Sequence, residues 1–205
     1  VLAVSVPLLL VWVCILLIVS FGVSKGVEKA NKVFLPLLVF LFLALVVRAL
    51  FLPGALEGLN AFFTPNWSAL TDSKVWIEAF AQIFFSLSVG FGIMLTYASY
   101  LKKKSNVTGT ALVAGFANSS FEILAGIGVF SALGFMAHSQ GVAVSELQGL
   151  RGPILSFVTF PKIVSMMPGG PLFGVLFFSS LVLAGITSLL SLLQVVSGAL
   201  QDKFA

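Results

Sequence analysis

Residues 82–92 read Gln82-Ile83-Phe84-Phe85-Ser86-Leu87-Ser88-Val89-Gly90-Phe91-Gly92 and lie in the middle of a hydrophobic segment. Two serines and two glycines within seven residues weaken helix hydrogen bonding at a depth where the bilayer offers no water to replace it. A broken helix is tolerated inside a membrane where the freed backbone lines a cavity or binds a ligand. The stretch therefore predicts a binding site around which the other spans pack.

The composition is that of a membrane protein. The chain is 59% hydrophobic and 9% charged with a mean hydropathy of +1.14, which is more apolar than one soluble core of 205 residues accommodates. The net charge of +4 comes from loop lysines, and no cluster of Lys or Arg interleaves with exposed aromatic residues. Nucleic-acid binding is therefore not expected. Cys14 is the single cysteine and indicates neither a disulfide framework nor a metal site.

Five hydrophobic segments are long enough to cross a bilayer as helices, and the third contains the interrupted stretch. They are residues 2–21, 33–52, 75–101, 107–136 and 171–200. Because lysines concentrate in alternate loops, the positive-inside rule places loops 53–74 and 137–170 outside the cell. The first outer loop has the pattern of a short helix over Ala55–Phe63. The second is expected to fold back as short helices rather than cross.

The predicted fold class is an all-α membrane protein with a single transmembrane domain over residues 1–205. The number of spans is odd, the chain opens at Val1 within an apolar run, and it stops at Ala205 soon after a hydrophobic segment. We therefore expect a fragment of a larger bundle, with partner helices missing at both ends.

Polar residues occupy the interior of two of these spans. Glu122 lies about halfway along the fourth, where a carboxylate costs at least ~2.5 kcal/mol unless it faces the bundle interior. Asn118 precedes it by four residues and shares its helix face. Interhelical hydrogen bonding is the alternative role for Asn118. In the fifth span, Thr187 and Ser188 follow Ala184, and hydroxyls at such positions usually bond their own backbone.

The interior therefore offers amide, hydroxyl and carbonyl oxygens with one carboxylate, a set that suits a hard cation and not zinc or copper. The single histidine, His138, falls in a predicted outer loop, where a solvated surface role is expected. The sequence assembles no Ser-His-Asp arrangement, phosphate-binding glycine loop or paired carboxylates. An enzyme is not predicted.

Ordered motifs run through much of the chain. They are Gly22-Val23-Ser24-Lys25-Gly26-Val27-Glu28-Lys29, Val75-Trp76-Ile77, the stretch 82–92, Thr96-Tyr97-Ala98-Ser99-Tyr100 and Ala184-Gly185-Ile186-Thr187-Ser188. With these motifs the chain resembles the neurotransmitter:sodium symporter family, in particular its bacterial LeuT-like amino-acid transporters. The resemblance makes the five spans the fourth to eighth helices of the family's twelve-helix inverted-repeat bundle.

The resemblance implies a sodium-coupled symporter of a hydrophobic or neutral amino acid, working by alternating access without chloride. Its partners would be the amino acid, sodium ions at two sites, the lipid bilayer and the missing helices of the same transporter. Its location would be the cell membrane as a multi-pass protein, with a bacterial inner membrane expected. The alternative from another class is a channel or a non-transporting scaffold subunit, in which the same polar residues only hold helices together.

Matching the family's motifs residue by residue implies two sodium sites. The first would use the Ser86 hydroxyl and Asn118. The second would use the Ala184 carbonyl and the hydroxyls of Thr187 and Ser188.

The resemblance further implies a substrate pocket beside the broken helix. Its residues would be Phe85, Ser86, Ser88, Phe91, Ser188 and Leu192. Phe85, Phe91 and Leu192 favour a hydrophobic substrate, because a charged side chain would need a buried partner that these positions lack.

Three more assignments follow from the resemblance. Glu122 stands where chloride-dependent relatives carry a serine, so its carboxylate would replace the chloride charge. Tyr100 and Asp202 match a cytoplasmic gate. Gly26 and Pro36 enclose nine residues, matching a motif for local helix unwinding, and the alternative is a helix start that happens to contain a proline.

Overall fold

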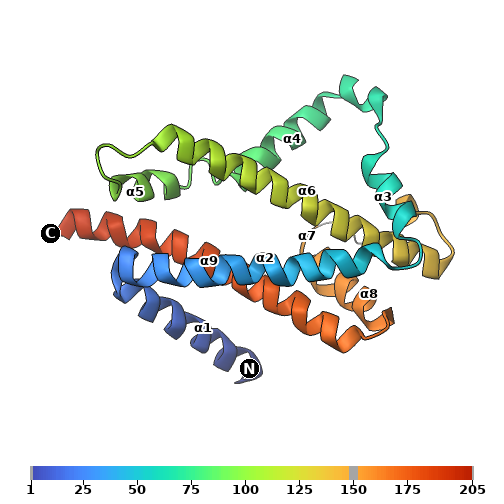
Figure 1. The fold of residues 1–205 in the computed structure, drawn as a ribbon, viewed down its shortest axis with the longest axis horizontal. Coiled ribbons are helices and arrows are strands. Elements are labelled where there is room, and N and C mark those ends of the chain that lie inside the picture. The colour runs from blue at the N-terminus through green and yellow to red at the C-terminus, as the bar shows by residue number, and fades with distance from the viewer. Residues whose placement is uncertain (1, 148–151, 205) are drawn as a thin grey trace. The chain divides into compact units, whose positions relative to one another are not determined.

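The computed structural model describes residues 2–147 and 152–204, and within these ranges the chain is helical without β-strands (Figure 1). The larger helices are α1 (Leu2–Ser20), α2 (Glu28–Leu50), α3 (Ala55–Phe63), α4 (Ser73–Ser86), α5 (Ile93–Ser99), α6 (Val107–Gln140), α8 (Phe160–Met166) and α9 (Gly170–Phe204). The short elements are η1 (Val23–Val27), η2 (Trp67–Thr71), η3 (Val144–Glu146), α7 (Gly152–Ile154) and η4 (Leu155–Thr159). The predicted all-helical class is confirmed, including the break in the third predicted span, which separates α4 from α5.

Three helices of the described chain are long and apolar enough to cross a membrane. They are Lys25–Leu50, Val107–Gln140 and Gly170–Phe204. Helix α1 is apolar but shorter, and the third predicted span is divided by its break. The second outer loop contains α7, η4 and α8, which together form one apolar helical segment, Gly152–Met166. Residues 148–151 of this loop lie outside the described chain.

The end of α2 follows directly from its sequence. Pro53 carries no amide hydrogen and cannot continue a helix, and Gly54 next to it takes a left-handed conformation with φ 81°. The last turn tightens, with the Leu52 amide donating to the Ala49 carbonyl at 3.2 Å. Helix α3 then begins at Ala55 with the bounds predicted from the sequence.

The chain forms two compact units, which we describe separately. The first comprises residues 1–39, 82–113 and 181–205, and the second comprises residues 40–81 and 114–180. In the first unit, the side chains of Ile15 on α1, Val27 on η1 and Leu190 on α9 are buried together. A Cβ on Gly26 would overlap the Ile18 carbonyl oxygen, so glycine permits the close return of the chain after α1.

The second unit is organised by the packing of α3 on the C-terminal half of α6 (Figure 1). Gly54, Gly58 and Phe62 recur every four residues, as expected where the i±4 ridges of one helix pack into the grooves of another. They lie against a matching series on α6, which is Gly126, Phe130, Gly134 and His138. The rings of Phe62 and Phe130 are 4.9 Å apart. A Cβ on Gly58 would overlap the Phe130 carbonyl oxygen, and one on Gly134 would overlap that of Gly54. The two helices therefore approach to backbone contact.

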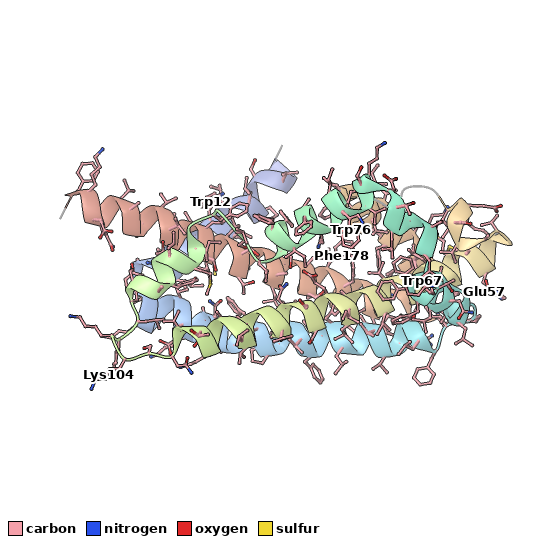
Figure 2. All side chains as sticks on the ribbon, turned by 90° about the horizontal axis from the view of Figure 1, so that it is seen from above. Trp12, Glu57, Trp67, Trp76, Lys104 and Phe178 are labelled. Atoms are coloured by element: carbon pink, nitrogen blue, oxygen red, sulfur yellow. The ribbon has the colours of Figure 1, made fainter. Side chains whose placement is uncertain are left out.

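His138 lies at the end of this α3–α6 contact. Its Nδ1 is 3.5 Å from Oε1 of Glu57, the α3 residue labelled in Figure 2. Both side chains are about half exposed, at 55% and 57%. His138 is exposed as predicted, but the predicted loop position is wrong, because α6 continues to Gln140 and His138 lies in its last turn. The structure adds a carboxylate partner, Glu57, from α3.

The close α3–α6 contact predicts that glycine-to-alanine substitutions within it destabilise the fold. We expect Gly134→Ala to lower the free energy of unfolding of the full-length protein by about 1–3 kcal/mol, because the new Cβ meets backbone atoms that cannot rotate away. Gly115→Ala is the matched control on α6, since no described atom lies within 4 Å of its Cβ position. That change should be neutral or stabilising. Thermal unfolding of both variants checks the prediction, and equal effects of the two would contradict it.

Candidate functional site

The predicted break lies between two helix ends that are closed by backbone hydrogen bonds. At the end of α4, the Val89 amide donates to the Phe84 carbonyl at 2.9 Å, which closes a wider turn than the α-helical one. At the start of α5, the Thr96 amide donates to the Gly92 carbonyl at 2.9 Å. Between these bonds the Phe91 amide donates to the Ser88 carbonyl at 3.3 Å, so a three-residue turn interrupts the α-helical ladder.

The backbone inside the break is left-handed at three positions. Ser88, Gly90 and Gly92 have φ values of 52°, 87° and 77°. Glycine adopts this conformation without steric cost, whereas serine pays about 1–2 kcal/mol. Ser88 is the non-glycine residue with positive φ in the described part of the chain. Because such conformations gather at functional sites, Ser88 marks this break as a candidate site.

The predicted substrate-binding side chains of the break lie close together in sequence but differ in exposure. Ser86, the last residue of α4, and Ser88 are half-buried. Phe85 and Phe91 are 72% and 48% exposed, so both rings lie at the surface of the described chain. All four belong to the first unit.

Helix α6 brings together the two polar residues predicted to share a face. Nδ2 of Asn118 donates to Oε1 of Glu122 at 3.1 Å, and both side chains are half-buried in the second unit. The shared face is confirmed. The carboxylate orients the amide, because a donating Nδ2 leaves the Asn118 carbonyl oxygen on the other side of the planar group. That oxygen is the kind of ligand that a hard cation takes.

Helix α9 carries the predicted second sodium segment in the first unit. Oγ1 of Thr187 donates to the Ala184 carbonyl at 2.9 Å, which places two of the predicted oxygen ligands side by side. This is the local backbone bond expected for a hydroxyl in a helix, and the oxygen that donates it keeps lone pairs for a cation. Ser188 is exposed, and Leu192, one turn further, is 40% exposed.

Tyr97 on α5 and Tyr100 directly after its last residue form hydrogen bonds to α9 that the sequence did not reveal. Oη of Tyr97 donates to Oγ of Ser191 at 3.0 Å, and Nε2 of Gln194 donates to Oη of Tyr100 at 3.0 Å. The second pair lies three residues further along both segments than the first. The two segments therefore run side by side in the same direction (Figure 1). The sequence signal was the matching spacing, with two polar residues on one face of an apolar helix.

The predicted gate residues line a common cavity. Tyr100 and Asp202 both border a space of about 410 Å³ between α5 and the end of α9, and Asp202 is exposed. The structure adds Gln194, which is 4% exposed, as the direct partner of Tyr100. Gln194 was missed because its partner lies 94 residues away.

Gly26 lies in an irregular turn that leads into α2, whereas Pro36 lies inside α2. The turn is the π-helical element η1, and α2 is continuous through Pro36. Pro36 also borders a cavity of about 610 Å³, together with Asn31 from α2 and Tyr97 and Tyr100. A π-helical turn is a common irregularity at functional positions.

The Tyr100–Gln194 bond predicts a stability change. We expect Tyr100→Phe to destabilise the full-length protein by about 1–3 kcal/mol, because the buried amide of Gln194 loses the hydrogen-bond partner that the described structure gives its nitrogen. Adding Gln194→Leu should recover part of the loss, since no polar group then remains unpaired. Unfolding of the two single variants and the double variant checks this, and strictly additive losses would refute it.

Comparison with known proteins places these features in a family. The model of the sodium:neurotransmitter symporter family matches residues 2–205. An uncharacterised sodium-dependent transporter of Methanocaldococcus jannaschii is 48% identical over 201 residues, covering 98% of this chain and 41% of that protein. The sodium-dependent serotonin transporter of Drosophila melanogaster is 38% identical over 195 residues, covering 93% of this chain and 31% of that protein.

A solved structure has a similar fold. The crystal structure of MhsT in complex with L-phenylalanine matches with a TM-score of 0.78 and 39% identity, covering 95% of this chain and 42% of that one. The chain thus spans less than half the length of these relatives. The likeness extends through the broken helix and the polar segments of α6 and α9, and the chain belongs to the sodium:neurotransmitter symporter family.

Proposed function

We propose that the full-length protein is a sodium-coupled symporter that carries a neutral or hydrophobic amino acid across the cell membrane by alternating access. The observation that carries this proposal is the break between α4 and α5, with Ser88 left-handed, in a chain that matches the family over residues 2–205. MhsT, whose structure holds L-phenylalanine, supports an amino acid as the substrate class. The channel or scaffold alternative has no comparable support.

The first proposed sodium site uses Ser86 and Asn118. Ser86 is the last residue of α4, so its hydroxyl-bearing side chain lies at the break. The amide of Asn118 is oriented by Glu122. Both supply the neutral oxygen ligands that sodium prefers, and a nearby carboxylate adds favourable charge.

The second proposed sodium site uses Ala184, Thr187 and Ser188. The 2.9 Å bond between Oγ1 of Thr187 and the Ala184 carbonyl supports this assignment, because it holds two hard oxygen atoms together before the ion binds. Preorganised ligands lower the entropic cost of binding.

The proposed substrate pocket lies beside the break. Phe85, Phe91 and Leu192 would contact the substrate side chain, which favours a hydrophobic amino acid. The hydroxyls of Ser86, Ser88 and Ser188 and the backbone carbonyls of the break would accept hydrogen bonds from the substrate ammonium.

We further propose that transport does not require chloride. The carboxylate of Glu122, bonded to Asn118, would supply beside the first sodium the negative charge that chloride supplies elsewhere in the family. The acid at this position also supports a prokaryotic transporter, and a bacterial inner membrane is the expected location.

Two further assignments concern the cytoplasmic side. Tyr100 and Asp202 would form part of the cytoplasmic gate, and Gln194 would hold Tyr100 in place. Gly26 and Pro36 would allow the start of α2 to unwind, and the π-helical turn of η1 supports this, because its hydrogen bonds are already wider than those of an α-helix.

A competition experiment tests the substrate class. Labelled L-phenylalanine is bound to the purified full-length protein in sodium, and each of the other common amino acids is added in excess. Displacement by neutral, apolar amino acids and not by Lys or Glu supports the proposal. Binding that is strongest for charged amino acids would overturn the hydrophobic assignment.

A further inference from the structure

Three hydrogen bonds, joined through Thr187 itself, connect α5 with the proposed second sodium segment of α9. Oη of Tyr97 donates to Oγ of Ser191 at 3.0 Å. Oγ of Ser191 donates to the carbonyl of Thr187 at 3.2 Å, and Oγ1 of Thr187 donates to the carbonyl of Ala184 at 2.9 Å. All of these residues belong to the first unit and are partly buried. The series ends on two of the three proposed sodium ligands.

The chemistry of hydroxyl groups fixes the direction of this series. Each hydroxyl has one hydrogen to donate. Ser191 uses its hydrogen on the Thr187 carbonyl, so its lone pairs remain as the acceptor for the Tyr97 phenol. Serine-to-backbone bonds within one helix are common, whereas the phenol comes from an element 94 residues away. Tyr97 is therefore the member of the series that links α9 to another part of the fold.

The position of Tyr97 makes its hydrogen bond to Ser191 sensitive to movement of α5. Tyr97 is on α5, the helix that follows the break, five residues after Gly92. Any displacement of α5 moves the phenol relative to Ser191 and frees the serine hydroxyl to choose another rotamer or acceptor. The Thr187 carbonyl then loses a fixed donor, and the turn that holds the oxygens of Ala184 and Thr187 loses one of its restraints.

We infer that Tyr97 is a positioning residue for the second sodium site, acting through Ser191 to couple the placement of α5 to the oxygens of Ala184 and Thr187. This inference rests on the proposed function. By thermodynamic reciprocity, sodium bound at this site favours the position of α5 in which the Tyr97–Ser191 bond is made. The ion therefore stabilises the helix beyond the break without touching it.

The test is a sodium titration of the full-length protein that follows its unfolding temperature, with choline replacing sodium so that ionic strength stays constant. A ligand that binds the folded state raises this temperature as its concentration exceeds its dissociation constant. Tyr97→Phe removes one neutral hydrogen bond, and we expect the apparent sodium dissociation constant fitted to this rise to increase roughly 2- to 10-fold. Ser191→Ala should give the same shift, and Tyr97→Phe with Ser191→Ala should shift it no further. Ser191→Thr, which keeps a hydroxyl, should stay near the wild type.

Ser99→Ala is the matched control. Ser99 is also on α5, and its hydroxyl donates at 2.7 Å to the Thr96 carbonyl of the same helix. It should leave the apparent sodium dissociation constant unchanged. A purely structural role of Tyr97 would lower the unfolding temperature equally at every sodium concentration without changing the apparent sodium dissociation constant, and that result would overturn the inference. If sodium does not raise the unfolding temperature of the wild type, the proposed function fails and the inference with it. If sodium raises it and the apparent sodium dissociation constant of Tyr97→Phe equals that of the wild type, the inference alone is refuted.

Discussion

Replacing Asn118 with alanine in the full-length protein is expected to weaken sodium and amino-acid binding together, by roughly 10- to 100-fold in apparent sodium affinity. The change removes the proposed amide ligand and leaves Glu122 without the hydrogen bond that Nδ2 donates to it at 3.1 Å. Because binding at coupled sites is reciprocal, a loss of sodium affinity lowers substrate affinity at the same sodium concentration. The measurement is equilibrium binding of labelled L-phenylalanine over a range of sodium concentrations.

The matched control for Asn118→Ala is Ser120→Ala, two residues further along the same helix. The Ser120 hydroxyl is exposed and donates at 2.8 Å to the Phe116 carbonyl, so removing it takes away a local bond only. It should leave the sodium titration unchanged. If Asn118→Ala folds normally and binds substrate with the sodium dependence of the wild type, Asn118 is not a sodium ligand.

Glu122→Ser is expected to make transport depend on chloride. The wild type should take up amino acid equally well when gluconate replaces chloride, if the carboxylate supplies the negative charge as proposed. In the variant, uptake in gluconate should fall at least about tenfold, which corresponds to about 1.4 kcal/mol of lost attraction to the nearby cation. Chloride should restore much of it, since the smaller serine leaves space and a hydroxyl donor for the anion.

Two results would count against this account of Glu122. A wild type that loses most of its uptake in gluconate would refute chloride independence. A variant that is equally active with and without chloride would show that the carboxylate charge is not used near the first sodium. Glu122→Gln separates charge from hydrogen bonding, since glutamine keeps an oxygen that can accept from Asn118 but carries no charge.

The break in the third predicted span could be predicted because its causes are local. The glycines at positions 90 and 92 permit positive φ, and the structure has them at 87° and 77°. The four-residue spacing of Asn118 and Glu122 likewise predicts a shared helix face, and their side chains are in contact. Such features depend on backbone conformation within a few residues, which the sequence encodes directly.

The contacts between distant segments could not be predicted in the same way. The Tyr97–Ser191 and Gln194–Tyr100 bonds join residues 94 positions apart, and either partner alone reads as a polar residue at a helix surface. The backbone contact of Gly58 with α6 has the same origin. A glycine pattern indicates close packing, but it does not identify the helix that packs against it.

Sodium-dependent binding of an amino acid to the full-length protein is the most direct test of the central claim that this chain forms part of a sodium-coupled symporter. Labelled L-phenylalanine is bound to purified protein in sodium chloride and, in parallel, in choline chloride of the same ionic strength. The account predicts saturable binding in sodium that is lost in choline and weakened by Asn118→Ala. Equal binding in the two salts, or no saturable binding of any neutral amino acid in sodium by folded protein, would contradict it.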